Sequence, residues 1–284
     1  MPQPEIHPPM SQTHADIERY VQAMPQHGDA LSFLQSVLDF QAALAGKIEP
    51  DPQIEPVVAR EKWEAGVPLF ADKSPAVPAP LFREALAELR PLLPPGDVLQ
   101  EVLDRLLASD LVASSHLEKV LADLVTDSDA CIRRLANAAS TTPDTVAPLL
   151  RIVLSPFFEK PAALYREWIR EAGWRRGICP ICGSEPWMAR LDRENGERTL
   201  ACSLCGTEWA FDRLRCPFCG GDDQPKVRYF TVDDDDAHRV DCCDRCQRYI
   251  KTVDDRVAGR PANLLVEDVI TSHLDTLARE HGYH

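Results

Sequence analysis

Long apolar runs are missing from this 284-residue sequence, and none approaches the ~20 residues that a membrane-spanning helix needs. The first ten residues contain four prolines and no apolar core, which is unlike a secretory signal peptide. We therefore expect a cytoplasmic protein with a disordered N-terminus and no stable membrane insertion.

Positive charge is also scarce, with 31 Lys and Arg against 45 Asp and Glu. Residues 174–252 hold 13 basic and 14 acidic side chains, so nearly all of the net charge of −14 lies elsewhere. A domain that binds nucleic acid needs a basic footprint to neutralise phosphates. We expect no nucleic-acid partner. The open alternative is a local patch of Arg213, Arg215, Arg245, Arg248 and Lys251.

Residue groupings typical of enzymes are absent as well. The eight histidines are scattered, and we find neither a nucleophile patterned with a base nor a phosphate-binding glycine loop. The acidic run Asp233 to Asp236 lacks the ligand spacing of a calcium-binding loop, so we interpret it as a solvated hairpin turn. We therefore predict that the protein is not an enzyme.

Cysteine, in contrast, is concentrated in one segment. Nine of the ten cysteines lie between Trp174 and Lys251. Eight of them form four Cys-x-x-Cys pairs, which are Cys179/Cys182, Cys202/Cys205, Cys216/Cys219 and Cys243/Cys246. The first and third pairs share the signature Cys-Pro-x-Cys-Gly, and a plainer pair follows each after 19 and 23 residues. The segment therefore contains one unit twice.

This spacing predicts metal sites. Two residues between cysteines let a tight turn direct both sulfurs at one tetrahedral ion, and the glycine after the second cysteine tolerates positive φ. Two such turns complete a four-cysteine site. We assign Cys179, Cys182, Cys202 and Cys205 to site one and Cys216, Cys219, Cys243 and Cys246 to site two. Interleaved pairing is the alternative. Four thiolates hold zinc or a single iron equally well by geometry.

Two other uses of these cysteines are disfavoured. Disulfides belong to oxidising compartments, and the sequence shows no secretory signal. Thioredoxin-like chemistry uses one Cys-x-x-Cys near a βαβ pattern, whereas this segment has four pairs separated by hairpin-like intervals. Of the other two cysteines, we interpret Cys131 as a small buried hydrophobe, with a reactive thiol as the alternative. We interpret Cys242 as a partly buried bystander, with a thiol poised next to the metal as the alternative.

The remaining pattern predicts an α+β multidomain protein. Amphipathic segments predict helices over 11–24, 29–46, 81–92, 97–108, 115–125, 127–139 and 143–154, and prolines at 156 and 161 are expected to end the last of these before a final helix up to residue 173. Short strands are expected between the cysteine pairs. The predicted domains are a helical domain (1–173), two small metal domains (174–213 and 214–252) and a C-terminal helix (253–284) that packs back on the other domains.

Specific motifs occur along the whole chain. They are Trp63-x-x-Gly66-x-Pro68-Leu69, Ser155-Pro156-Phe157-Phe158, Trp174 before Cys179-Pro180-Ile181-Cys182-Gly183-Ser184-x-Pro186, Leu200-x-Cys202-Ser203-Leu204-Cys205-x-x-Glu208-Trp209, Arg213-x-x-Cys216-x-x-Cys219 and Cys243-x-x-Cys246-x-x-Tyr249-x-Lys251. With these motifs the sequence resembles the FdhE family of bacterial formate dehydrogenase accessory proteins. It departs from the family pattern at Ala210 and Cys242.

The resemblance implies a helical domain followed by two rubredoxin-like domains that bind iron, with the cysteine pairs needed for metal and for partner binding. It also implies a role as a maturation factor, or chaperone, that binds the catalytic subunit of a respiratory formate dehydrogenase, a molybdenum enzyme, in the cytoplasm before export. The main alternative is a rubredoxin-like redox protein that passes electrons to or from a partner enzyme.

Overall fold

The computed structural model describes residues 10–51, 53–113, 116–126, 128–171, 173–221, 227–232 and 235–284. The chain forms two compact units. The sheet unit holds Met1–Ser32, Ile54–Lys73 and Ala162–His284, and the helical unit holds Phe33–Gln53 and Ser74–Pro161. The expected disordered start and Asp233 and Asp234 of the expected turn lie outside the described residues, whereas Asp235 and Asp236 of that turn begin a strand.

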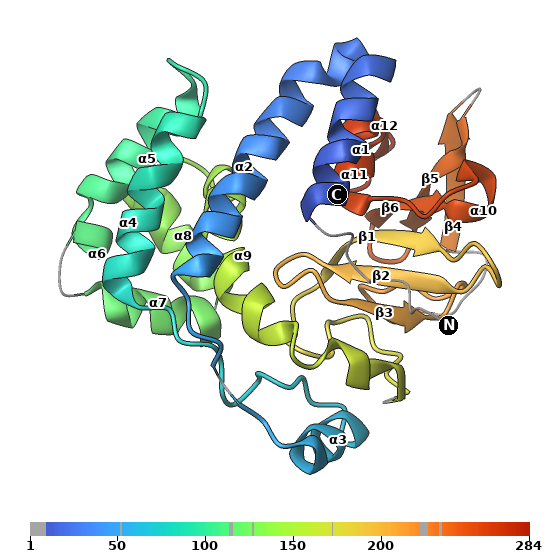
Figure 1. The fold of residues 1–284 in the computed structure, drawn as a ribbon, viewed down its shortest axis with the longest axis horizontal. Coiled ribbons are helices and arrows are strands. Elements are labelled where there is room, and N and C mark those ends of the chain that lie inside the picture. The colour runs from blue at the N-terminus through green and yellow to red at the C-terminus, as the bar shows by residue number, and fades with distance from the viewer. Residues whose placement is uncertain are drawn as a thin grey trace. The chain divides into compact units, whose positions relative to one another are not determined.

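The helical unit consists of helices and the connections between them (Figure 1), and their buried residues form its core. Its elements are most of α2 (Gly28–Gly46), α4 (Ala79–Leu89), η2 (Arg90–Leu92), α5 (Val98–Ala108), α6 (Asp110–Ala113), α7 (Leu117–Thr126), α8 (Ser128–Ala138) and most of α9 (Pro143–Ala162). Asp97 caps α5 as expected, because its side chain accepts a hydrogen bond from Leu99 N. No helix in the described part of the chain is long and apolar enough to cross a membrane.

Helix α9 corrects one expectation. The prediction that Pro156 and Pro161 interrupt the helix is wrong, because α9 continues from Pro143 to Ala162 through three internal prolines. An internal proline removes a backbone hydrogen bond and costs ~3 kcal/mol. Phe157 and Phe158 are buried, and full burial of such a side chain contributes about 1.5–3 kcal/mol. Packing of the aromatic residues therefore offsets part of the cost of the prolines.

The sheet unit is organised by one six-stranded sheet with the order β3-β2-β1-β6-β5-β4. The strands are β1 (Pro186–Leu191), β2 (Arg198–Cys202), β3 (Glu208–Phe211), β4 (Val227–Val232), β5 (Asp235–Cys243) and β6 (Arg248–Asp254). Neighbouring strands are antiparallel within β1–β3 and within β4–β6, and β1 pairs with β6 in parallel. Each antiparallel half carries one of the two cysteine units.

Strand β6 is not expected from the sequence, although Tyr249 to Val253 is rich in β-branched and aromatic residues. Its parallel pairing with β1, from Met188 opposite Lys251 to Leu191 opposite Asp254, joins the two halves into a continuous sheet. The predicted boundaries at residues 173, 213 and 252 divide the chain by cysteine unit, and this division stays a prediction.

Helices α11 (Leu264–Ile270) and α12 (Ser272–Glu280) pack against the sheet. Leu274 and Ala278 form a buried cluster with Val240 and Cys242. The buried face of these helices contains Val266, Ile270 and Leu274. Pro261 precedes α11 and does not lie in its first turn, because the helix begins at Leu264.

The sheet unit also contains four short elements outside the sheet. They are α1 (Met10–Ala23), η1 (Pro25–His27), η3 (Arg166–Glu171) and α10 (Asp255–Ala258). In addition, α3 (Pro56–Glu64) forms where an irregular connection is expected. Trp63 and Ala59 are the buried residues of α3, so this helix presents its aromatic residue to the rest of the unit.

Candidate metal centres

The four sulfurs of site one lie close together. Cys179 Sγ is 3.6 Å from Cys205 Sγ, and Cys182 Sγ is 3.3 Å from Cys202 Sγ. All four sulfurs lie within 4.8 Å of one another. A tetrahedral ion with metal–sulfur bonds of ~2.3 Å has sulfur–sulfur edges of about 3.8 Å. The cluster therefore has the size of a four-thiolate metal site.

Site two repeats this geometry. Cys216 Sγ lies 3.7 Å from Cys246 Sγ, and Cys219 Sγ lies 3.7 Å from Cys243 Sγ. These four sulfurs also lie within 4.8 Å of one another. The structure groups the eight thiols by repeat unit and not in the interleaved order. That they ligate metal ions stays a prediction.

The two Cys-Pro-x-Cys-Gly turns have the same hydrogen bonds. Gly183 N donates to Cys179 O and Gly220 N donates to Cys216 O, both at 3.0 Å. The φ angles of these glycines are +81° and +66°, in the left-handed region that only glycine enters without strain. Backbone N–H groups also point at sulfur, as Ile181 N does at Cys179 Sγ (3.4 Å). The repeated sequence signature is thus a repeated backbone conformation.

The protonation of these thiols depends on their crowding. Burial raises the pKa of Cys179, Cys202 and Cys216. Burial alone would also raise the pKa of Cys205, but hydrogen bonds from the other thiols of site one and from Thr207 lower it. Four neighbouring thiols cannot all ionise without a cation, so a bound metal ion would displace their protons. Metal affinity is therefore expected to weaken as the pH falls.

The two cysteines outside the clusters are buried in apolar surroundings. Cys131 is 1% exposed in α8, and its thiol donates to Val120 O. Cys242 is 2% exposed, belongs to the cluster with Val240 and Leu274, and its pKa is raised to about 12, mainly by burial. A protonated, buried thiol is a poor nucleophile. Both cysteines are buried, and that they act as bystanders stays a prediction.

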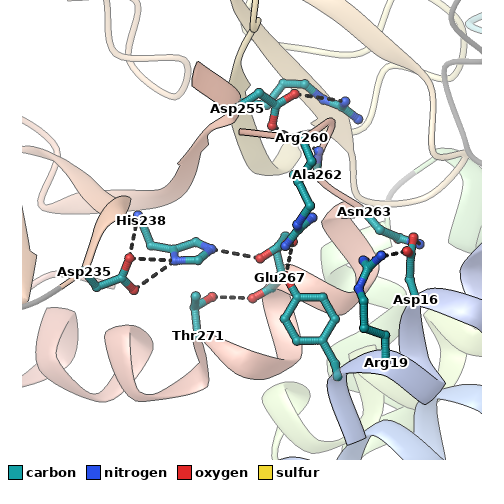
Figure 2. A network of polar contacts seen from close by, with 12 residues as sticks. Asp16, Arg19, Asp235, His238, Asp255, Arg260, Ala262, Asn263, Glu267 and Thr271 are labelled. Atoms are coloured by element: carbon teal, nitrogen blue, oxygen red, sulfur yellow. Dashed lines mark hydrogen bonds and ion pairs between the residues drawn. The ribbon is translucent and has the colours of Figure 1, made fainter. Parts of the chain in front are cut away.

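A network of buried polar groups in the sheet unit escaped the sequence analysis (Figure 2). The fully buried carboxylate of Glu267 accepts hydrogen bonds from Tyr20 Oη (3.1 Å) and Arg260 (2.7 Å), and it lies 2.9 Å from His238 Nε2. His238 Nδ1 faces Asp235 at 2.9 Å, so the imidazolium form satisfies both carboxylates. The network connects α1, β5 and α11. In the sequence, the sign of this network is Glu267, an acidic residue on the apolar face of α11.

Comparison with known proteins shows which proteins this chain is similar to. The sequence profile of the FdhE central domain matches residues 178–213, which contain site one. The chain is 28% identical over 219 residues to the FdhE protein of Escherichia coli O127:H6, a match that covers 71% of this chain and 69% of that protein. The chain is thus similar to an FdhE protein over 71% of its length.

Two further similar proteins extend the comparison. An FdhE homolog of Aquifex aeolicus is 35% identical over 113 residues, which span 39% of this chain and only 40% of that protein. The crystal structure of the FdhE protein from Pseudomonas aeruginosa matches with a TM-score of 0.66 at 22% identity, covering 98% of this chain and 94% of that one. The predicted combination of helices, a small sheet and two four-cysteine clusters is thereby confirmed.

Proposed function

We propose that this protein is a non-enzymatic, cytoplasmic accessory protein for the maturation of a respiratory formate dehydrogenase. It binds the catalytic subunit through or near the two four-cysteine clusters. Similarity to FdhE proteins and the motifs shared with that family support this role. The observation that carries the metal part of the proposal is the arrangement of eight cysteines in two groups of four, with the sulfurs of each group within 4.8 Å of one another.

The metal ions would act on structure in this proposal. Iron is favoured by the family resemblance, and zinc fits the same four thiolates. Four protein thiolates leave no open coordination position for a reacting water, which argues against metal-dependent hydrolysis. Each ion would hold the two turns of one antiparallel half together, because such small units bury little apolar surface.

Affinity co-purification tests the partner. The tagged protein is recovered anaerobically from cells that make formate dehydrogenase, beside a variant with Cys179, Cys182, Cys216 and Cys219 changed to Ser. We expect the catalytic subunit with the native protein and not with the variant. The control is Cys131→Ala, which removes a cysteine that lies outside both clusters. Absence of the subunit from the native, metal-loaded protein would contradict the proposal.

A rubredoxin-like redox role is the second candidate. A closed cluster of four cysteines is also the ligand set of a single redox-active iron. In that case the iron-loaded protein shows a reversible potential, and the partner enzyme oxidises or reduces it. Retention of partner binding by the zinc-loaded, redox-silent protein favours the accessory role instead.

A further inference from the structure

The two clusters share one turn geometry but differ in what covers them. At site one, two carbonyls of the first turn accept hydrogen bonds from a segment more than a hundred residues away in the sequence. Trp63 Nε1 and Leu69 N donate to Pro180 O at 2.8 and 2.9 Å, and Phe70 N donates to Ile181 O at 2.8 Å. We name residues 62–72 the cap segment.

The cap segment is itself well packed. Trp63, Leu69 and Phe70 are 7%, 0% and 2% exposed. Lys62 ties the segment into a loop by donating to Leu69 O (2.9 Å) and by pairing with Asp72. The loop rests directly on the turn, since a Cβ added at Gly183 would lie 3.3 Å from a carbon of the Pro68 ring. Site one is therefore covered by a rigid, apolar layer.

The other turn of site one is also held from outside the cysteine unit. Arg166, in η3, donates to Cys205 O at 2.8 Å. Tyr165, which directly precedes η3, packs edge-on against Phe70 of the cap segment, with ring centroids 6.2 Å apart, and against Trp168 of η3. Opening site one would require these contacts to break together.

Site two has a thinner cover. In the part of the chain that the structure describes, no segment makes the corresponding hydrogen bonds to Pro217 O or Phe218 O. The Phe218 ring lies under the guanidinium of Arg248 (3.7 Å), which pairs with Glu185. Arg248 and Glu185 have side-chain exposures of 32% and 51%. Ion pairs as exposed as this contribute little to stability, so they oppose opening weakly.

Solvent also reaches closer to site two. Two of its four cysteines are only partly buried, against one of four in site one. A small, partly open pocket of about 10 Å³ borders Cys216 and Cys243, with Arg198 and Arg248 in its wall. Arg198 is 1% exposed, and its Nε has no hydrogen-bond partner among the described residues. The pocket has room for about one water, which would satisfy such an atom.

We propose that the cap segment seals site one as a permanent structural centre, whereas site two exchanges its metal ion with the surroundings. Release of an ion from four thiolates requires a local opening that lets a competing ligand or water reach the metal. At site one that opening must displace Trp63, Leu69 and Phe70. At site two it must displace the exposed Arg248–Glu185 ion pair, the close approach of Gly177 to Pro217 O and the hydrogen bond from His284 N to Gln247 O, but no buried apolar layer like the cap segment. The inference rests on the proposed metal binding and is independent of the formate dehydrogenase partner.

Chelation of the zinc-loaded, full-length protein tests the inference. Zinc content is measured first, and fewer than two ions per chain would overturn the metal proposal together with this inference.

Excess EDTA is then added with N-ethylmaleimide, and labelled cysteines are mapped by mass spectrometry over time. We expect two phases that differ in rate by about tenfold or more. Cys216, Cys219, Cys243 and Cys246 should be labelled in the fast phase. Labelling of both clusters together, or of site one first, would overturn the proposal.

A conservative variant tests the cap directly. Trp63→Phe keeps an aromatic ring but removes the N–H that donates to Pro180 O. We expect the slow phase to accelerate about two- to tenfold, the effect of one hydrogen bond, while the fast phase stays unchanged. The matched control is Trp187→Phe, whose side chain packs against the cluster of Met188 and Val253. Unchanged slow release in Trp63→Phe, or equal acceleration in the control, would contradict a seal by the cap segment.

Discussion

At the residue scale, the contact between His238 and Glu267 favours the positively charged form of the histidine ring. Burial of the ring by itself lowers the pKa of His238, but hydrogen bonds and negative charge from Glu267 and Asp235 outweigh it and raise the pKa above its ordinary value. Arg260 and Tyr20 are the other polar groups that face Glu267. A raised histidine pKa means that the interaction stabilises the fold fully below the ordinary pKa of ~6.5, and that this stabilisation is lost as the pH rises through the folded-state value.

We therefore predict that NMR titration of the ring protons gives a pKa for His238 above ~6.5. Glu267→Gln should lower this pKa, because it removes the buried charge that favours the imidazolium. The same variant should lose about 1.5–3 kcal/mol of unfolding free energy, since it weakens hydrogen bonds to a charged acceptor. An unchanged His238 pKa in Glu267→Gln would show that the buried carboxylate does not control this ring.

At the element scale, the first turn of site two depends on a glycine just before the first turn of site one. A Cβ added at Gly177 would lie 1.7 Å from Pro217 O, a backbone atom that cannot rotate away. We predict that Gly177→Ala lowers the unfolding free energy by about 1–3 kcal/mol, as overpacking does elsewhere. Loss of zinc from site two should accompany it, measured by metal content.

Gly28→Ala is the matched control for this substitution. Gly28 lies at the start of α2, and a Cβ there would meet nothing within 4 Å. Chemical denaturation of both variants in the zinc-loaded state separates the effect of the close approach from the general effect of replacing glycine. Equal stability of the two variants would mean that Gly177 and Pro217 O do not approach each other as closely as described.

At the scale of the whole molecule, the two units should respond differently to loss of metal. All eight cluster cysteines belong to the sheet unit, whereas the helical unit has its own buried core. Metal binding contributes about 10 kcal/mol or more to the folding of small zinc peptides. We predict that chelation removes the near-ultraviolet circular dichroism of the sheet unit and leaves much of the far-ultraviolet helical signal. Complete loss of the helical signal on chelation would contradict this division.

The sequence by itself determined most of the helices, five of the six strands and the grouping of the eight cysteines. These features depend on local rules: helical periodicity, turn residues such as Gly183, and the short span of a Cys-x-x-Cys turn. Helices α3 and α9 are exceptions, because the sequence predicts no helix at the first and an earlier end for the second. The burial of Phe157 that offsets the prolines of α9 is a property of the packed core and has no local signature.

Only the tertiary structure decided how distant segments meet. The parallel pairing of β1 with β6, the cover of site one by Trp63 and Phe70, and the Glu267 network each join residues separated by 60 or more positions. No residue near Cys179 indicates that Trp63 will donate to the turn beside it. Such contacts form because the folded chain buries apolar surface and satisfies buried polar groups as a whole, and one sequence without structure does not show which partners achieve this.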